Sequence, residues 1–224
     1  ALCFARAHVF SRVLKKSCFS RRVHTIEKFM HSIFLSVGET LKEFNTTMEY
    51  VMDSFPVSVC HNIRIFNNRI LPRDEQYRGK CVSKSQYFYG FRVQVIATLD
   101  GIPVEFAIVP GSWHDSKGMH ALTMNLPAGS RNISDSAYTD YAVEDLMKEC
   151  ENIWHDSERK SNSKRTEPAY RRYYKSRIRK LIESTFAQIT AMIPRKIHAT
   201  TIKGFLLKLK FFIWSFTFKK LCFQ

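Results

Sequence analysis

The feature that most constrains the fold is a pair of β-rich runs, 87–98 and 102–109, joined by Leu99-Asp100-Gly101. Asp-Gly between two such runs is a strong signal for a β-hairpin. A third apolar run, 50–59, precedes them and contains a single carboxylate, Asp53. The pattern therefore predicts three strands in an antiparallel meander, the first of which carries Asp53.

After the meander the chain alternates between helical and extended patterns. The sequence predicts a helix over 116–122, a strand over 130–134, a helix from 139 to about 149, a strand over 151–155 and a long helix over 171–192. The first of these strands stops at Asp135, and Pro194 ends the long helix. Three strands followed by alternating helices and strands indicate a mixed α/β fold, with one sheet and helices on its faces.

Two regions flank this pattern. Residues 1–48 read as a helical segment, most amphipathic over 29–44, and residues 49–224 as the main domain. The apolar stretch 204–223 has four lysines, and its uncharged part of 8 residues is too short to span a bilayer. We expect a buried or basic amphipathic terminal helix, a soluble chain and no signal peptide. The first 48 residues are too few for a helix-turn-helix module plus a helix leading to Asp53, so we expect a truncated DNA-binding region.

The charge balance points to a polyanionic partner. The chain has 35 Lys and Arg against 20 Asp and Glu, a net charge of +15, on a composition that is 45% apolar. Nucleic acid is the first candidate partner and an anionic membrane surface the second, although the charge could simply keep the protein soluble. The 6 cysteines are scattered without zinc spacing, which favours a reduced, intracellular protein. No Gly-rich phosphate loop is present, which argues against an ATP-driven mechanism.

Three acids occupy positions that suggest chemistry. Asp53 lies within an apolar strand, Asp135 ends the next strand of the α/β part, and Glu183 lies on the flank of the apolar stripe of the long helix. Converging acids repel one another unless cations bind between them, and their oxygens suit Mg²⁺ or Mn²⁺ in a two-metal site. The alternatives are an edge-strand Asp53, a turn-capping Asp135 and a Glu183 paired with Arg179.

Several short sequence motifs add to this pattern. The resembling segments are DSFPVSVC (53–60), YFYGFRV (87–93), GIPVEF (101–106), PGSWHD (110–115), DSAYTDY (135–141) and IESTFAQI (182–189). In order and content they resemble the DDE transposases of bacterial insertion sequences, from about residue 45 to 210. Many relatives have a basic residue directly after the second aspartate, where this chain has Ser136.

The resemblance implies a ribonuclease-H-like fold, in which three antiparallel strands are followed by parallel ones. It also implies metal-dependent cleavage of DNA and strand transfer at the ends of an element, with Asp53, Asp135 and Glu183 as catalytic residues and ligands of Mg²⁺ or Mn²⁺. The partners would be double-stranded DNA and further copies of the chain assembled on it, in the bacterial cytoplasm at the nucleoid. A nuclease that only hydrolyses and a DNA-binding remnant without activity are the alternatives.

The DNA contacts are expected from basic segments around the long helix. Residues 156–180 hold ten Lys and Arg against three acids, with three interleaved tyrosines, Tyr170, Tyr173 and Tyr174. These tyrosines could flank DNA, or two of them could be buried in an ordinary helix. The DNA-contacting residues that we expect are Arg171, Arg172, Lys175, Arg177, Arg195 and Lys196. Asp115 could add a fourth carboxylate to the site, although a turn at the end of a loop, with this aspartate as its cap, is the favoured interpretation.

Overall fold

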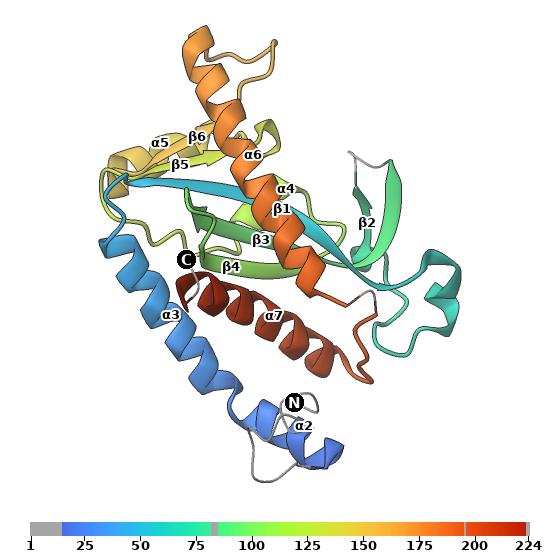
Figure 1. Cartoon of the computed structure of the whole chain (residues 1–224). Coiled ribbons are helices and arrows are strands. Elements are labelled where there is room, and N and C mark those ends of the chain that lie inside the picture. The colour runs from blue at the N-terminus through green and yellow to red at the C-terminus, as the bar shows by residue number, and fades with distance from the viewer. Residues whose placement is uncertain (1–14, 82–84, 195, 223–224) are drawn as a thin grey trace.

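The computed structural model describes residues 15–81, 85–194 and 196–222 (Figure 1). The helices are α2 (Lys16–Thr25), α3 (Glu27–Glu43), α4 (Asp115–Met119), α5 (Tyr141–Glu151), α6 (Ala169–Met192) and α7 (Ile202–Cys222), with the 3-10 turns η1 (Asn62–Asn67), η2 (Glu75–Tyr77) and η3 (Ser136–Tyr138). The strands are β1 (Glu49–Cys60), β2 (Arg78–Cys81), β3 (Gln86–Thr98), β4 (Pro103–Pro110), β5 (Arg131–Ser134) and β6 (Trp154–Ser157).

The strands form one mixed sheet of six strands in the order β2-β3-β1-β5-β6, with β4 also paired to β3. β1, β3 and β4 are antiparallel neighbours, whereas β5 and β6 lie parallel to β1 on its other side. The predicted meander and mixed α/β class are therefore confirmed. Three antiparallel strands followed by parallel ones, with helices on both faces, is the ribonuclease-H-like arrangement.

The turn between β3 and β4 depends on glycine. Gly101 has a φ of 74°, in the left-handed region that side chains disfavour. A Cβ atom at this position would also lie 2.3 Å from Thr185 Oγ1 on α6, so the hairpin turn packs directly against that helix.

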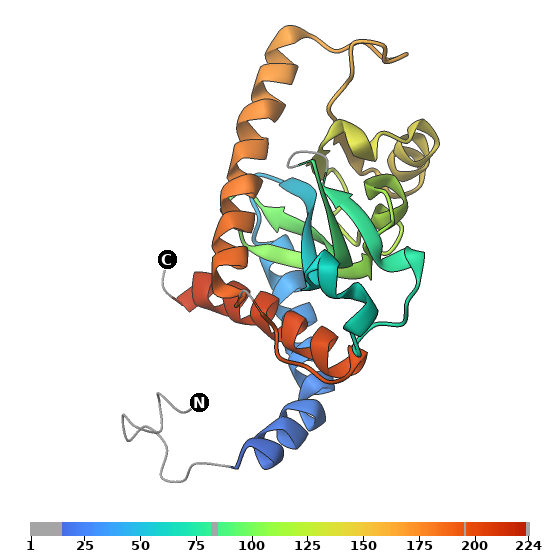
Figure 2. The ribbon, with the colours of Figure 1, turned by 90° about the vertical axis from the view of Figure 1, so that its right-hand side faces the viewer.

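Alternation along β1 divides its side chains between two apolar layers. Val51, Phe55 and Val57 belong to the layer formed with α6 and α7, while Tyr50 and Met52 belong to the layer formed with α4, α5 and residues 122–126. Figure 2 shows α6 and α7 on one side of the sheet and the α4–α5 region on the other. Asp53 lies on the same face of β1 as Val51 and Phe55, which is the face covered by α6.

The helices at the two ends of the described chain pack together on this core. Phe34 of α3 is buried with its ring centroid 5.1 Å from that of Phe106 on β4. Lys210 of α7 forms an ion pair of 2.9 Å with Glu27. Trp214 of α7 is completely buried, so the terminal helix is a core element of the fold. Among the described residues, no helix has the length and apolar content needed to cross a membrane.

Two parts of the topology differ from the sequence prediction. β2 and the turns η1 and η2, between the first and second strands of the meander, were not expected from the sequence. β6 spans Trp154–Ser157 instead of 151–155, because α5 continues to Glu151 and ends at Asn152, which has a left-handed φ of 53°.

Candidate active site

Asp53 and Asp135 lie next to each other at the carboxyl end of β5. β1 and β5 are parallel and pair Met52 with Ser134, so the two aspartates are the next residues on adjacent strands. Neighbouring strands lie about 4.8 Å apart, so the two aspartates lie close together at the point where β5 ends beside β1. This is the position at which open α/β sheets place functional groups.

The Asp53 carboxyl group is poorly suited to carry a negative charge in this setting. Burial raises its pKa from 3.8 to about 7, and the charges of Asp115 and Asp135 act in the same direction. The backbone N–H of Ser54, which donates a 2.7 Å hydrogen bond to Oδ1, and the Arg179 guanidinium oppose that shift without cancelling it. Binding of a cation here would therefore be favoured, because its charge would reduce the repulsion between the carboxylates.

Arg179 of α6 is the cation that the fold itself supplies. Its Nη2 lies 3.4 Å from Asp135 Oδ2, and its Nη1 donates a 2.8 Å hydrogen bond to Glu158 Oε2. Burial disfavours the charged guanidinium, but Asp135, Glu158 and Asp53 outweigh that effect and raise the pKa of Arg179. Asp135 is further held by the Ser136 backbone N–H at 2.5 Å, as the cap of η3.

Glu183 approaches the pair of aspartates from α6, one turn after Arg179. Its Oε1 lies 4.0 Å from Arg179 Nη2, and its side chain is 62% exposed. The carboxylate oxygens of Glu183 and Asp135 both lie within 4.0 Å of the same nitrogen and so are at most twice that distance apart. The neighbouring Ile182 is buried against β1, which keeps Glu183 on the rim of the core.

Two of the three predicted acids, Asp135 and Glu183, lie within 4.0 Å of the Arg179 guanidinium. In the part of the chain that the structure describes, no group of three or more His, Cys, Asp or Glu side chains is arranged to hold a metal ion. Asp53 and Asp135 are adjacent, and Glu183 lies across Arg179 from Asp135. The donor chemistry fits a hard divalent cation, since all three candidate groups are carboxylates and oxygen ligands suit such ions.

A fourth carboxylate lies behind Asp53. Asp115 opens α4, and its Oδ1 accepts hydrogen bonds from Ser54 Oγ at 2.6 Å and from Arg92 at 3.1 Å. Asp115 does not cap α4, whose N-cap is His114, but its charge contributes to the raised pKa of Asp53, as a fourth carboxylate near the site would. Sequence reasoning missed Arg92 and Ser54, although an arginine inside the apolar run 87–98 was a signal that it has a buried partner.

Lys175 requires a correction. Its side chain is only 2% exposed, and its Nζ lies 2.5 Å from both Asp156 and Glu167. It also donates a 3.0 Å hydrogen bond to the Ser157 carbonyl. A lysine whose charge is used inside the fold cannot contact a phosphate, so Lys175 leaves the set of expected DNA contacts.

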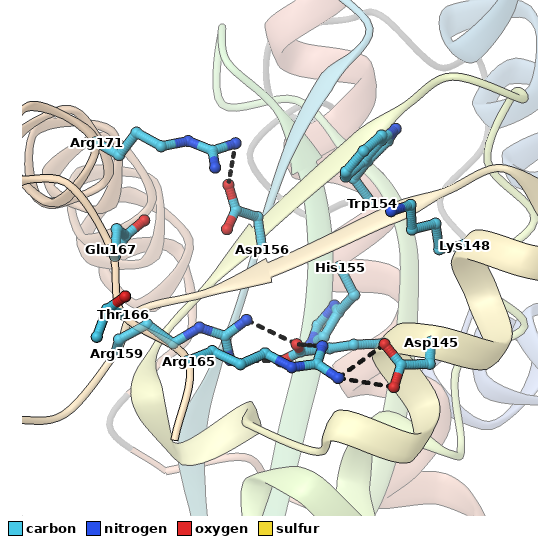
Figure 3. Close-up of a pocket in the computed structure, with 11 residues that line it drawn as sticks. Asp145, Lys148, Trp154, His155, Asp156, Arg159, Arg165, Thr166, Glu167 and Arg171 are labelled. Carbon is cyan, nitrogen blue, oxygen red and sulfur yellow. Dashed lines mark hydrogen bonds and ion pairs between the residues drawn. The ribbon is translucent and has the colours of Figure 1, made fainter. Parts of the chain in front are cut away.

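The other basic residues of 156–180 divide into paired and free ones. Arg171 pairs with Asp156 at 3.7 Å, and Arg165 makes two hydrogen bonds to Asp145 (Figure 3). Among the described residues, exposed cations of this segment without an ion pair are Lys160, Lys164, Arg172, Arg177 and Lys180. Lys196 is also exposed, and Arg195 lies outside the described residues.

The tyrosines at the start of α6 all face outward. Tyr170, Tyr173 and Tyr174 are 73%, 66% and 42% exposed, so the alternative of two buried tyrosines is wrong. Tyr174 donates its hydroxyl hydrogen bond to Glu49 Oε2, which raises the pKa of this tyrosine to about 12. Tyr170 and Tyr173 are therefore the two available to a ligand.

A comparison of the sequence with known protein families identifies the family of this chain. Residues 43–200 match the family described as "Transposase DDE domain", a segment that covers the whole sheet and α6. No curated protein and no solved structure matches the chain. Since the match includes most of the chain and all three candidate acids, the chain belongs to the transposase DDE domain family.

Proposed function

We propose that this protein is the transposase of an insertion sequence, which cuts DNA at the ends of the element and joins the freed 3′ end to target DNA. The observation that carries the proposal is the proximity of Asp53, within β1, to Asp135, directly after the end of the parallel strand β5, beside the helix that bears Glu183. The excess of basic residues supports DNA as the substrate.

Asp53, Asp135 and Glu183 would hold Mg²⁺ or Mn²⁺ in this proposal. When bound, a pair of such ions activates the attacking oxygen and stabilises the leaving oxygen of a phosphodiester. The surrounding residues of the chain would hold these carboxylates in position. The Ser54 and Ser136 backbone N–H groups fix the rotamers of the two aspartates, and Arg179 balances their charge.

The wider organisation is part of the same proposal. Residues 1–48 would form a helical N-terminal segment and residues 49–224 the catalytic domain with its basic C-terminal helix. The chain would act as an oligomer assembled on double-stranded DNA, in the cytoplasm at the nucleoid. Backbone contacts would come from Arg171, Arg172, Arg177, Arg195 and Lys196.

A DNA-binding protein without cleavage activity is the second candidate. Two observations favour it: Arg179 stands among the acids, and Ser136 follows Asp135 where many relatives have a basic residue. A serine cannot form the charge-assisted contact with a phosphate that a lysine or arginine makes.

The test is incubation of the protein with a labelled duplex taken from the DNA that flanks its reading frame, with and without Mn²⁺. Joining of a 3′ end to a second duplex would support the transposase, and nicks alone would show a nuclease. Intact DNA with undiminished binding would favour the second candidate. Asp53→Asn should abolish products, while Asp100→Asn, in the exposed β3–β4 turn, should leave them unchanged.

A further inference from the structure

A groove of about 1270 Å³ lies beyond the end of β1, away from the paired aspartates. It is bounded by the end of β1, the segment around η1, the start of β3 and the connection between α6 and α7. The lining residues are Ser58, Val59, Cys60, His61, Asn62, Arg64, Asn67, Asn68, Arg69, Ile70, Gln86, Tyr87, Lys196 and Ala199. Neither the family match nor the catalytic acids assign a role to this groove.

The groove is positively charged, and its cations are available to bind a ligand. Arg64, Arg69 and Lys196 line it, and its lining contains no Asp or Glu. None of these three cations has an ion pair with any residue that the structure describes, in contrast to the internally paired cations near the start of α6. Unpaired cations in a concave surface without acids favour an anionic occupant.

An aromatic ring stands in the same groove. Tyr87, at the start of β3, is 59% exposed, and Lys80 Nζ lies 5.7 Å from the centre of its ring. Val59, Ile70 and Ala199 add apolar surface to the lining. A basic groove with an exposed aromatic ring is the combination that binds unpaired nucleic acid, because cations follow the backbone while a base stacks on the ring. A duplex hides the faces of its bases and would leave the ring unused.

The groove is within reach of the site of cleavage. Ser58 lies five residues after Asp53 on β1, roughly 17 Å away at the rise of a strand. Val59, Cys60 and Ile70 pack against the layer formed with α6 and α7, so the groove opens on the side of the sheet where Asp53 lies. About five stacked nucleotides at 3.4 Å each cover that distance.

We propose that this groove binds an unpaired DNA strand, with its phosphates on Arg64, Arg69 and Lys196 and one base stacked on Tyr87. The source of the strand, an element end opened beside Asp53 and Asp135, rests on the proposed function. The binding itself does not, since it depends on residues outside the catalytic acids.

The stacking contact is tested by fluorescence anisotropy with a labelled twelve-nucleotide oligo(dT) in the presence of a chelator. Tyr87→Ala should weaken binding about fivefold or more, since stacking on an aromatic ring contributes that much or more per base. Tyr87→Phe keeps the ring and should bind within about twofold of the wild type. Phe29→Ala removes a similarly exposed ring from α3, a residue with no proposed ligand contact, and should have no effect. Unchanged binding by Tyr87→Ala, or an equal loss with Phe29→Ala, would overturn the proposal.

The phosphate contacts are tested by the salt dependence of the same binding. Arg64→Gln with Arg69→Gln should flatten the slope of log K against log [salt] by about 1.4, because each phosphate contact on a single strand contributes about 0.7. Lys219→Gln with Lys220→Gln removes the same charge from the last turn of α7 and should leave the slope unchanged. An equal flattening by both pairs would mean that only net charge matters and would refute the groove. No metal is needed here, so a protein that binds oligo(dT) in the groove but cuts nothing would refute the proposed function alone.

Discussion

Replacing Asp53 by asparagine should stabilise the protein without bound metal, and more so as the pH rises. The folded chain holds this carboxyl group in a buried position next to Asp115 and Asp135, which raises its pKa to about 7. An amide in the same place carries no charge, and its oxygen can still accept the hydrogen bond from the Ser54 N–H. The substitution therefore removes an unfavourable charge while it keeps the local geometry.

The pH dependence sets the size of this effect. A carboxyl group with a pKa of 3.8 in the unfolded chain and about 7 in the folded one binds its proton more tightly when folded. Its contribution to stability is complete below pH 4 and is lost as the pH rises toward 7. Between pH 5 and pH 8 the two pKa values correspond to a loss of up to about 2.5 kcal/mol in the wild type, which Asp53→Asn should not show.

The measurement is urea unfolding of both proteins at pH 5, 6, 7 and 8 in the presence of a chelator. Other groups titrate equally in both, so the difference between the two free energies of unfolding isolates Asp53. Asp100→Asn, in the exposed turn, is the matched control and should follow the wild type. A difference between Asp53→Asn and wild type that stays constant from pH 5 to pH 8 would show that this carboxyl group has an ordinary pKa, and the electrostatic account of the site would fail.

Two further predictions concern the basic residues around α6. Lys175→Met should lower the free energy of unfolding by about 3–5 kcal/mol, because it leaves Asp156 and Glu167 without their buried cation; urea unfolding with the exposed Lys180→Met as control measures this, and an equal effect of both would contradict it. Arg172→Gln with Arg177→Gln should flatten the salt dependence of duplex binding by up to about 1.8, or 0.9 for each lost phosphate contact; an unchanged slope in a filter-binding titration would place the duplex elsewhere.

The parts of the fold that the sequence predicted are those in which local chemistry decides the structure. The β3–β4 hairpin follows from Asp100-Gly101, and the end of α6 follows from Pro194. β1 was recognisable because it is an apolar run that contains one carboxylate, and β5 because it is a short segment that stops at Asp135. Their parallel pairing then brings Asp53 and Asp135 together, because strand order in an α/β sheet is restricted to a few topologies.

The parts that escaped prediction depend on contacts between distant segments. Lys175 reads as one more cation in a basic stretch, and only the packing of β6 and the segment before α6 shows that Asp156 and Glu167 surround it. The groove around Tyr87 brings together β1, η1 and the α6–α7 connection, and η1 has no periodic pattern that would have placed it. Pairing of charges and the walls of a groove are properties of the tertiary structure.

Arg179 explains how three acids can share this edge of the sheet in the folded chain. Burial raises the pKa of Asp53, and the charge of the adjacent Asp135 acts in the same direction. Asp135 forms an ion pair with the guanidinium, with its Oδ2 3.4 Å from Nη2. Pairing of Glu183 with Arg179 along the helix and a shared site with Asp135 began as alternative interpretations of the sequence. In the structure a single nitrogen of Arg179 faces both carboxylates, so the pairing of Glu183 with Arg179 along the helix also places Glu183 beside Asp135.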